Sequence, residues 1–234
     1  MPNNATLIVA LDFPNGKQAI ACVESLPETV THYKIGLELF IAEGPAIIKA
    51  VTDLGRSVFL DLKLHDIPNT VAKSVTTACE HGVSLLTLHA SGGRAMMEAA
   101  AAAAAEYGES APQLLAVTAL TSLSQEDFAD LGIKREMTDH VLALGRLAVS
   151  SGIDGMVCSP LEAGTLRGTL GPEPLLVTPG IRPADASLGD QKRAATPASA
   201  VEAGANYLVV GRPITQAGNP AESALSILRE MSIA

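Results

Sequence analysis

Residues 58–68 read Val58-Phe59-Leu60-Asp61-Leu62-Lys63-Leu64-His65-Asp66-Ile67-Pro68, an apolar run that ends in charged residues and then in proline. A short apolar run bounded in this way is typical of a buried strand, which we expect at Val58–Leu62. Pro68 restricts Ile67 to an extended conformation and leads the chain toward a helix expected at Ala72–His81. The stretch therefore predicts a strand, a polar loop and a helix in succession.

The same succession recurs along the rest of the chain. Further strands are expected at Leu7–Leu11, Tyr33–Ile35, Leu85–Leu88, Leu114–Val117, Met156–Cys158, Leu175–Val177 and Tyr207–Val210. Further helices are expected at Ala19–Ser25, Pro45–Leu54, Gly93–Tyr107, Asp139–Ser151, Leu161–Arg167, Ala198–Ala203 and Ala221–Met231. Alternation on this scale predicts an α/β fold, a (β/α)8 barrel in which residues 1–234 form a single domain.

An open, doubly wound sheet is the alternative arrangement for alternating strands and helices. In its dinucleotide-binding form the first strand is followed by a Gly-rich turn. Here the first strand ends in Leu11-Asp12-Phe13-Pro14, which contains no such turn. The barrel is therefore favoured over the open sheet.

Composition and charge limit the classes of partner. The net charge of -9 argues against binding to nucleic acid or an anionic membrane, because those surfaces attract clustered Lys and Arg. A phosphorylated small molecule is compatible, since a few local donors can bind a phosphate. The chain has no targeting or membrane-spanning pattern, and Cys22, Cys79 and Cys158 lie among apolar neighbours. We expect these cysteines to be reduced and the protein to be cytoplasmic.

Charged residues stand where several expected strands end. In a barrel these ends lie on one face, so residues far apart in sequence become neighbours. Asp61 and Lys63 alternate along an extended strand and should share a face, with Lys34 and Asp12 on the two preceding strands. An isolated Asp-x-Lys pair is usually a solvated ion pair, but an array of alternating acids and lysines favours a catalytic site.

The stretch Asp61-Leu62-Lys63-Leu64-His65-Asp66-Ile67-Pro68-Asn69-Thr70 resembles the signature of orotidine 5′-monophosphate decarboxylases. Other blocks resemble those of the family in the expected order, namely Ala10-Leu11-Asp12, Tyr33-Lys34-Ile35-Gly36, Leu120-Thr121-Ser122, Thr178-Pro179-Gly180-Ile181-Arg182, Gly189-Asp190-Gln191-Lys192-Arg193 and Val210-Gly211-Arg212-Pro213-Ile214. They span nearly the whole chain, with no departure at a functional position. The resemblance implies decarboxylation of orotidine 5′-monophosphate to uridine 5′-monophosphate in pyrimidine biosynthesis, without a cofactor or metal.

The resemblance also implies how the charged residues act. Lys63 would protonate C6 of the pyrimidine as carbon dioxide leaves, within a network that includes Asp61, Asp66 and Lys34. The physics fits this role, because an ammonium stabilises the developing carbanion far better in a closed, low-dielectric site than in water. The two neighbouring carboxylates should keep Lys63 protonated.

The resemblance implies contacts along the whole substrate. Its binding residues would be Asp12, Lys34, Asp61, Leu62, Lys63, Leu64, His65, Asp66, Ile67, Pro68, Asn69, Thr70, Thr121, Ser122, Pro179, Arg182, Gln191, Gly211 and Arg212. Asp12 and Lys34 would bind the ribose, while Asp66 and Thr70 would reach the neighbouring site of a homodimer. Thr121-Ser122 would contact the pyrimidine, although a Thr-Ser pair followed by Gln and Glu is equally typical of a helix cap.

The phosphate site is expected in the loops after the last two strands, where barrels often bind phosphate. Those loops carry Arg182, Gln191, Gly211 and Arg212. Arg212 offers a planar fork of donors, and Gly211 permits close approach of the backbone. The connection Pro179–Thr196 resembles a lid over the phosphate, and its alternative is an ordinary surface loop.

Three other functions deserve comparison. His65 and His89 with Asp61 and Asp66 contain the donor types of a metal site, but strand-end histidines usually serve as hydrogen-bonding scaffold.

Related sugar-phosphate barrels, such as 3-keto-L-gulonate 6-phosphate decarboxylase, resemble the chain in the Asp-x-Lys-x-x-Asp element and use Mg²⁺. Lys34, Ile67-Pro68-Asn69-Thr70 and the Thr121-Ser122 pair favour the pyrimidine nucleotide instead. A nucleotide-binding barrel without catalysis should have a broken charge array, whereas this chain retains all of it.

Overall fold

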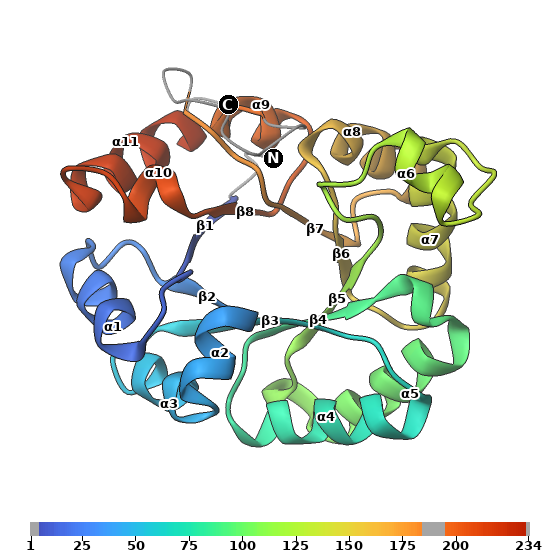
Figure 1. Ribbon diagram of the computed structural model, residues 1–234, viewed down its shortest axis with the longest axis horizontal. Helices are drawn as coiled ribbons and strands as arrows, with labels where there is room; N and C mark the ends of the chain where they lie inside the picture. Colours follow the sequence, from blue (N-terminus) through green and yellow to red (C-terminus); the bar gives the residue numbers. More distant parts are fainter. Residues whose placement is uncertain (1–4, 184–194, 233–234) are drawn as a thin grey trace.

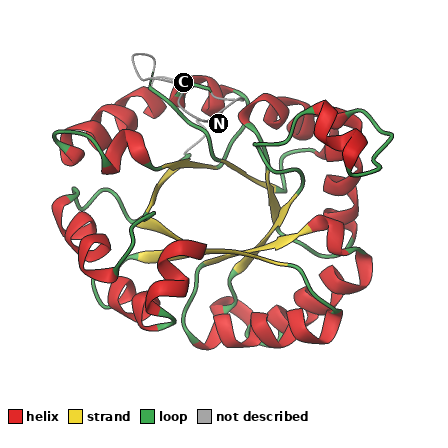
Figure 2. Ribbon diagram, in the orientation of Figure 1, coloured by secondary structure: helices red, strands yellow, loops and turns green. Residues whose placement is uncertain are grey.

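The computed structural model describes residues 5–183 and 195–232. Its parallel strands close into a barrel in the order β1 to β8, with β8 hydrogen-bonded to β1, and helices surround it (Figures 1 and 2). The strands are β1 (Thr6–Ala10), β2 (His32–Gly36), β3 (Ser57–Leu64), β4 (Leu85–His89), β5 (Gln113–Val117), β6 (Gly155–Val157), β7 (Leu175–Thr178) and β8 (Tyr207–Val210). The predicted (β/α)8 barrel, also called a TIM barrel, is confirmed.

The helices follow the strands along the chain. They are α1 (Gly16–Ser25), α2 (Leu37–Glu43), α3 (Ala46–Thr52), α4 (Pro68–Glu80), α5 (Arg94–Ala105), α6 (Gln125–Asp130), α7 (Met137–Ser150), α8 (Pro160–Leu170), α9 (Pro197–Glu202), α10 (Arg212–Thr215) and α11 (Pro220–Ser232), with 3-10 turns η1 (Ala90–Gly92) and η2 (Gly108–Ser110). Among the described residues, no helix has the length and apolar character needed to cross a membrane.

Short helices α2, α6 and α10 were not expected from the sequence. Each lies in the connection between a strand and the helix that was expected to follow that strand, namely α3, α7 and α11. The longer helices agree with the predicted ones to within a few residues. For example, α4 begins at Pro68 instead of Ala72, because proline is well suited to the first helical position.

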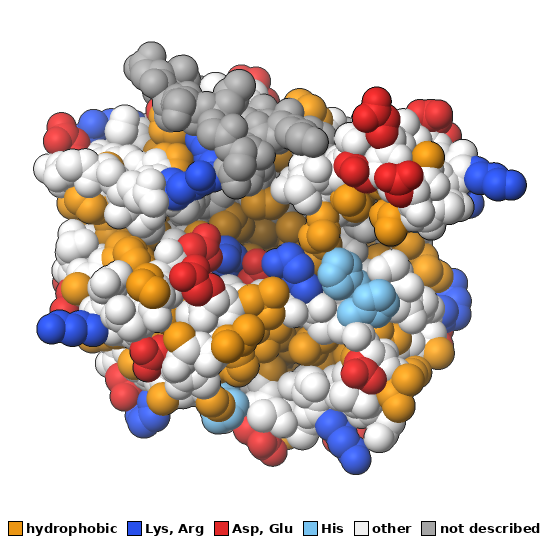
Figure 3. All heavy atoms as spheres, viewed as in Figure 1, with side chains coloured by type: hydrophobic (Ala, Val, Ile, Leu, Met, Phe, Trp, Pro, Cys, Tyr) orange, Lys and Arg blue, Asp and Glu red, His pale blue; other side chains and the backbone are white. Residues whose placement is uncertain are grey.

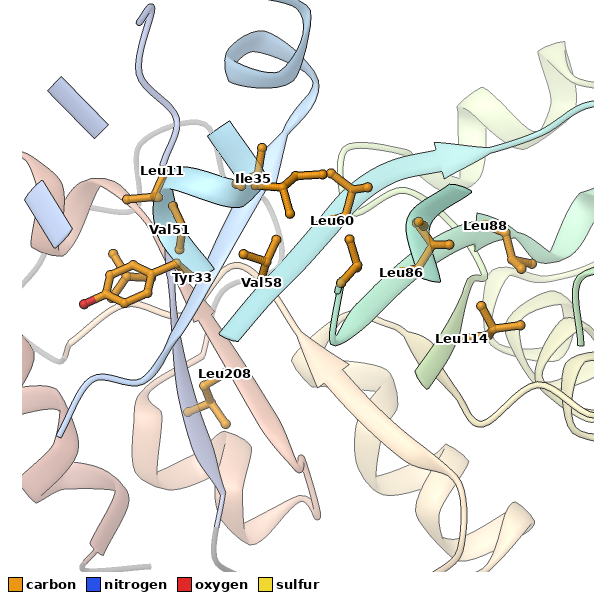
Figure 4. Packing of buried hydrophobic residues seen from close by; sticks show 14 of the residues in the cluster. Leu11, Tyr33, Ile35, Val51, Val58, Leu60, Leu86, Leu88, Leu114 and Leu208 are labelled. Carbon is orange, nitrogen blue, oxygen red and sulfur yellow. The ribbon is translucent and has the colours of Figure 1, made fainter. Parts of the chain in front are cut away.

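Side chains alternate between the inside of the barrel and the helical layer. One apolar cluster holds Ile8, Phe59, Leu115 and Val177 together with other residues from the strands, and it fills the barrel interior. A larger cluster joins the opposite faces of the strands to the surrounding helices. Figure 4 shows members from β2 to β5 and β8, with Leu11 just after β1 and Val51 on α3. At the carboxyl ends of the strands, residues that continue the inward-facing alternation therefore point into the mouth of the barrel.

Candidate active site

A chain of alternating charges lies at the carboxyl ends of the first three strands. Nζ of Lys34 on β2 lies 2.9 Å from Oδ1 of Asp12 and 3.7 Å from Oδ2 of Asp61. The same Oδ2 atom lies 2.9 Å from Nζ of Lys63. Figure 3 shows acidic and basic side chains gathered in a hollow at the middle of the barrel face, with histidines beside them. The expected meeting of Asp12, Lys34, Asp61 and Lys63 is observed.

The Lys63 backbone departs from the regular strand that we expected. Leu60 pairs with Leu86 whereas Leu64 pairs with Leu88, so four steps along β3 match two along β4. Lys63 has φ 53°, and among the described residues it is the one non-glycine residue with positive φ. A left-handed backbone costs an L-residue roughly 1–2 kcal/mol. Asp61 and Lys63 thus meet across a bulge, and simple alternation does not explain their contact.

A cavity of about 220 Å³ lies beside the charge array. One wall carries Lys34, Asp61 and Lys63, and the remaining lining is Phe59, Val117, Ala119, Leu120, Thr121, Val157, Pro179 and Val209. Charges at one side of a largely apolar cavity interact more strongly than in bulk water, because apolar walls lower the local dielectric constant. The arrangement can stabilise negative charge that develops on a planar ring held against the ammonium groups.

Gly36 allows Lys34 and Asp12 to approach one another. A Cβ atom added at this glycine would lie 2.9 Å from Nζ of Lys34 and 3.3 Å from Oδ1 of Asp12. A distance below 3.0 Å forces a shift, and here the flexible ammonium would have to move. The absence of a side chain at Gly36 therefore preserves the ion pair, which is a functional signal within the Tyr33-Lys34-Ile35-Gly36 block.

Asp66 does not join the array within this chain. Its Oδ1 atom accepts a hydrogen bond of 2.7 Å from the backbone N–H of Ile67. Among the described residues no salt bridge reaches Asp66, and residues 65–70 are exposed. Within one chain Asp66 therefore does not contact Lys63, and its expected role beside Lys63 stays a prediction that involves a second copy of the chain. The helix α4 begins at Pro68, and Asp66 and Thr70 are both exposed and do not line the described cavity of their own chain.

Thr121 and Ser122 lie in the loop between β5 and α6. Thr121 lines the cavity, whereas Ser122 is absent from its described lining. The pair does not cap the following helix. Ser124 is the N-cap of α6, where its side chain and that of Asp127 form a reciprocal capping box. The cap hypothesis for the Thr-Ser pair is wrong because the helix begins two residues later than that pair requires.

Two arginines lie near the ends of β7 and β8. Arg182 is 9% exposed, and its Nη1 atom donates 2.9 Å to the carbonyl of Ile181. Burial lowers the pKa of Arg182 from its usual value, and the nearby positive charge of Arg212 lowers it further. Two guanidinium groups that repel one another in this way are suited to an anion. Gln191 and most of the expected lid lie outside the described residues.

The histidines stand beside the array without forming a metal centre. The rings of His65 and His89 are 5.3 Å apart between centroids and are tilted by 40°. Burial lowers the pKa of His89, the charges of His65 and Lys63 lower it further, and Asp61 opposes them. Residues 5–183 and 195–232 contain no group of three or more His, Cys, Asp or Glu arranged to hold a metal ion.

Sequence reasoning overlooked Thr87 and the apolar lining of the cavity. Thr87 is fully buried in β4, where its hydroxyl bonds to both Asp61 and Lys63. Its signal in the sequence is a hydroxyl residue inside the apolar run Leu85–Leu88. Val117 and Val157 are the last residues of β5 and β6, and both line the cavity. The sequence does not distinguish apolar strand residues that line a cavity from those that lie in a core.

Comparison with known proteins places these features in a family. The model of the family described as "Orotidine 5'-phosphate decarboxylase / HUMPS family" matches residues 5–227. The chain is 48% identical over 231 residues to the orotidine 5'-phosphate decarboxylase of Shewanella sediminis, covering 99% of each sequence. It is 49% identical over 214 residues to that of Pseudoalteromonas translucida, covering 92% of each. A crystal structure of orotidine 5'-phosphate decarboxylase from Lactobacillus acidophilus superposes with a TM-score of 0.87 at 39% identity, covering 97% of this chain and 99% of that one.

Proposed function

Because the chain belongs to the orotidine 5'-phosphate decarboxylase / HUMPS family, we propose that the ammonium of Lys63 protonates C6 of orotidine 5′-monophosphate as carbon dioxide leaves. The chain is an enzyme of pyrimidine biosynthesis, a carboxy-lyase that acts on this nucleotide. The observation that carries the proposed mechanism is the position of Lys63, 2.9 Å from Asp61 on the charged wall of the cavity.

The proposed reaction transfers the negative charge of the substrate carboxylate to one carbon atom, C6. When the bond from C6 to the carboxylate breaks, its electron pair stays on C6 and carbon dioxide departs. A proton then moves from Nζ of Lys63 to C6, and the resulting amine regains a proton from solvent. The apolar side of the cavity, which includes Val117 and Val157, strengthens the attraction between the ammonium and the carbanion by excluding water.

The remaining residues would bind the substrate away from the reacting carbon. Asp12 and Lys34 would hydrogen-bond the ribose hydroxyls, and Thr121 would contact the pyrimidine edge. Arg182 and Arg212 would bind the phosphate, since a guanidinium presents donors that match phosphate oxygens. The shifted pKa of Arg182 supports a shared anion there, because an anion would relieve the repulsion between the two arginines.

The proposed reaction needs neither a metal nor an organic cofactor, because Lys63 supplies both the positive charge and the proton. This distinguishes it from the Mg²⁺-dependent sugar-phosphate barrels. We expect the ultraviolet absorbance of orotidine 5′-monophosphate to decrease at the same rate with purified protein before and after treatment with EDTA. A rate abolished by EDTA and restored by Mg²⁺ would contradict cofactor independence. Tight binding of uridine 5′-monophosphate without release of carbon dioxide would favour a non-catalytic barrel.

The proposal includes a homodimer in which Asp66 and Thr70 reach the site of the partner. Both residues are exposed, and neither is part of the described lining of their own cavity. The side chains of Ile41 on α2 and Ile67 are 79% and 66% exposed, and an apolar groove of about 250 Å³ lies between α3 and α4. Burying such surface against a second copy is favourable by about 25 cal/mol per Å². Figure 3 shows hydrophobic side chains just below the charged hollow.

Mixed subunits test the shared site. Lys63→Ala and Asp66→Ala should each be nearly inactive alone, but dimers that contain one subunit of each retain one site with both residues intact. After unfolding and refolding an equal mixture, we expect about a quarter of wild-type activity, because half of the randomly formed dimers are mixed. A mixture of Lys63→Ala with Lys34→Ala is the control. Lys34 and Lys63 of one chain belong to the same site, so each site of a mixed dimer lacks one of the two lysines and no activity should return. Failure of the first mixture to recover activity would argue against a shared site.

The acidic net charge and the three free cysteines support a small-molecule enzyme of a reducing compartment, and hence the cytoplasm. Cys79 and Cys158 are buried and Cys22 is partly buried. Burial raises the pKa values of Cys22 and Cys79, so their thiols are kept in the less reactive protonated form. Nucleic acid is not among the expected partners.

A further inference from the structure

We infer that Thr87 is a positioning residue for decarboxylation, because its hydroxyl holds both the left-handed backbone of Lys63 and the carboxylate of Asp61. Oγ1 of Thr87 lies 2.9 Å from the backbone nitrogen of Lys63 and 3.0 Å from Oδ1 of Asp61. Thr87 is 0% exposed and is not part of the cavity lining. It therefore acts on the site through these two residues and has no contact with the reacting atoms.

The direction of both hydrogen bonds follows from the chemistry of the partners. A backbone N–H can only donate, so Oγ1 must accept from Lys63. An ionised carboxylate can only accept, so the hydroxyl must give its one proton to Asp61. A valine of the same shape can form neither bond, whereas serine can form both. The position of Thr87 therefore requires a hydroxyl group. A residue that served only to pack the strand would not require one.

The bulge in β3 explains why the backbone of Lys63 needs this partner. Where β3 departs from its regular pairing with β4, the N–H of Lys63 faces the side chain of Thr87 instead of a backbone carbonyl. Without the hydroxyl, this N–H would be left with no partner in the interior, and the left-handed conformation of Lys63 would lose its support. The Lys63 side chain would then no longer be held toward the cavity.

The second hydrogen bond orients the carboxylate within the array. Thr87 binds Oδ1 of Asp61, while Oδ2 is directed at Nζ of Lys63 at 2.9 Å and Nζ of Lys34 at 3.7 Å. Fixing one oxygen of a carboxylate sets the position of the other. By contrast, the hydroxyl of Thr118, directly after β5, donates to a backbone carbonyl, that of Val157 at 3.2 Å. Thr87 is therefore suited to align the two charged groups whose separation matters for proton transfer.

The inference rests on the proposed function, and its test compares Thr87→Val with Thr87→Ser. We expect Thr87→Val to lower kcat roughly 10- to 100-fold, since a displacement of about 1 Å can cost about a hundredfold in rate. KM should stay within about threefold, because the phosphate and ribose contacts are untouched. Thr87→Ser should restore most of the rate. In hydrogen-exchange mass spectrometry, the segment that contains Lys63 should exchange faster in Thr87→Val.

Ser151→Ala is the matched control for loss of a buried hydroxyl. Ser151 is 4% exposed, donates 2.8 Å to the carbonyl of Leu147, and follows α7 at the opposite end of the barrel. This variant should lose stability without losing kcat. Should Thr87→Val not fold, Thr87→Ala compared with Thr87→Ser tests the same hydroxyl.

A folded Thr87→Val with wild-type kcat would overturn the inference, whether or not its KM is raised. That result beside an inactive Lys63→Ala would refute the role of Thr87 alone. A fully active Lys63→Ala would instead refute the proposed function, so the two failures can be told apart.

Discussion

Replacing Lys63 by alanine should lower kcat for orotidine 5′-monophosphate by roughly 10⁴-fold or more, about 5 kcal/mol of activation free energy. The substitution removes the proposed proton donor and the cation closest to the developing carbanion, and both losses act in the transition state. KM should change far less than kcat, because the phosphate and ribose contacts remain. Stopped assays of carbon dioxide release and continuous absorbance assays should agree on the loss.

Lys73→Ala is the matched control for Lys63→Ala. Lys73 is exposed on α4, and its substitution should leave both kcat and KM near wild type. Circular dichroism should show that the Lys63 variant folds, since Asp61 keeps its hydrogen bond to Thr87 and its proximity to Lys34. A folded Lys63→Ala enzyme with wild-type turnover would disprove the central claim about the mechanism.

Replacing Arg212 by alanine should lower kcat/KM by about 10³-fold, with losses in kcat as well as in affinity. Enzymes use binding energy from remote parts of a substrate to orient the reacting part, so a lost phosphate contact reduces turnover even at saturation. The nucleoside orotidine provides a strong test. It lacks the phosphate, and wild type and Arg212→Ala should therefore convert it at equal, low rates.

Arg229→Ala is the corresponding control, because Arg229 is an exposed arginine in the last turn of α11. It should not alter the kinetics with either substrate. Unchanged kcat in Arg212→Ala at saturating nucleotide would show that the phosphate contributes to binding alone. That result would contradict the proposed link between phosphate contact and catalysis, while leaving the role of Lys63 intact.

The dimer proposal explains an otherwise puzzling part of the sequence. Asp66 and Thr70 belong to the same block as Asp61 and Lys63, yet they lie outside the cavity of their own chain. A residue that completes the site of a second copy has no local signal beyond its presence in the motif. Its placement depends on an interface, which neither spacing nor strand alternation reveals.

The architecture could be predicted from local patterns because it repeats them. Each apolar run identifies a strand that is covered on both sides, and the longer apolar-periodic stretches identify the surrounding helices. The helices α2, α6 and α10 lie in the connections that precede the expected helices α3, α7 and α11, and the apolar pattern did not indicate them. Of the two roles considered for Thr121-Ser122, that of helix cap is wrong, because Ser124 caps α6 through reciprocal hydrogen bonds with Asp127.

The sequence by itself determined the (β/α)8 architecture and which residues carry the charges at its mouth, because hydrophobic periodicity and residue type are local properties. Only the tertiary structure decided how those charges meet. Lys63 takes its left-handed conformation in a bulge whose shape depends on β4, and the supporting hydroxyl of Thr87 lies 24 residues further along the chain. Asp66 is likewise exposed outside the described cavity lining, just before α4 begins at Pro68. Strand register and hydrogen-bond partners depend on segments far away in the sequence, so local residue spacing does not predict them.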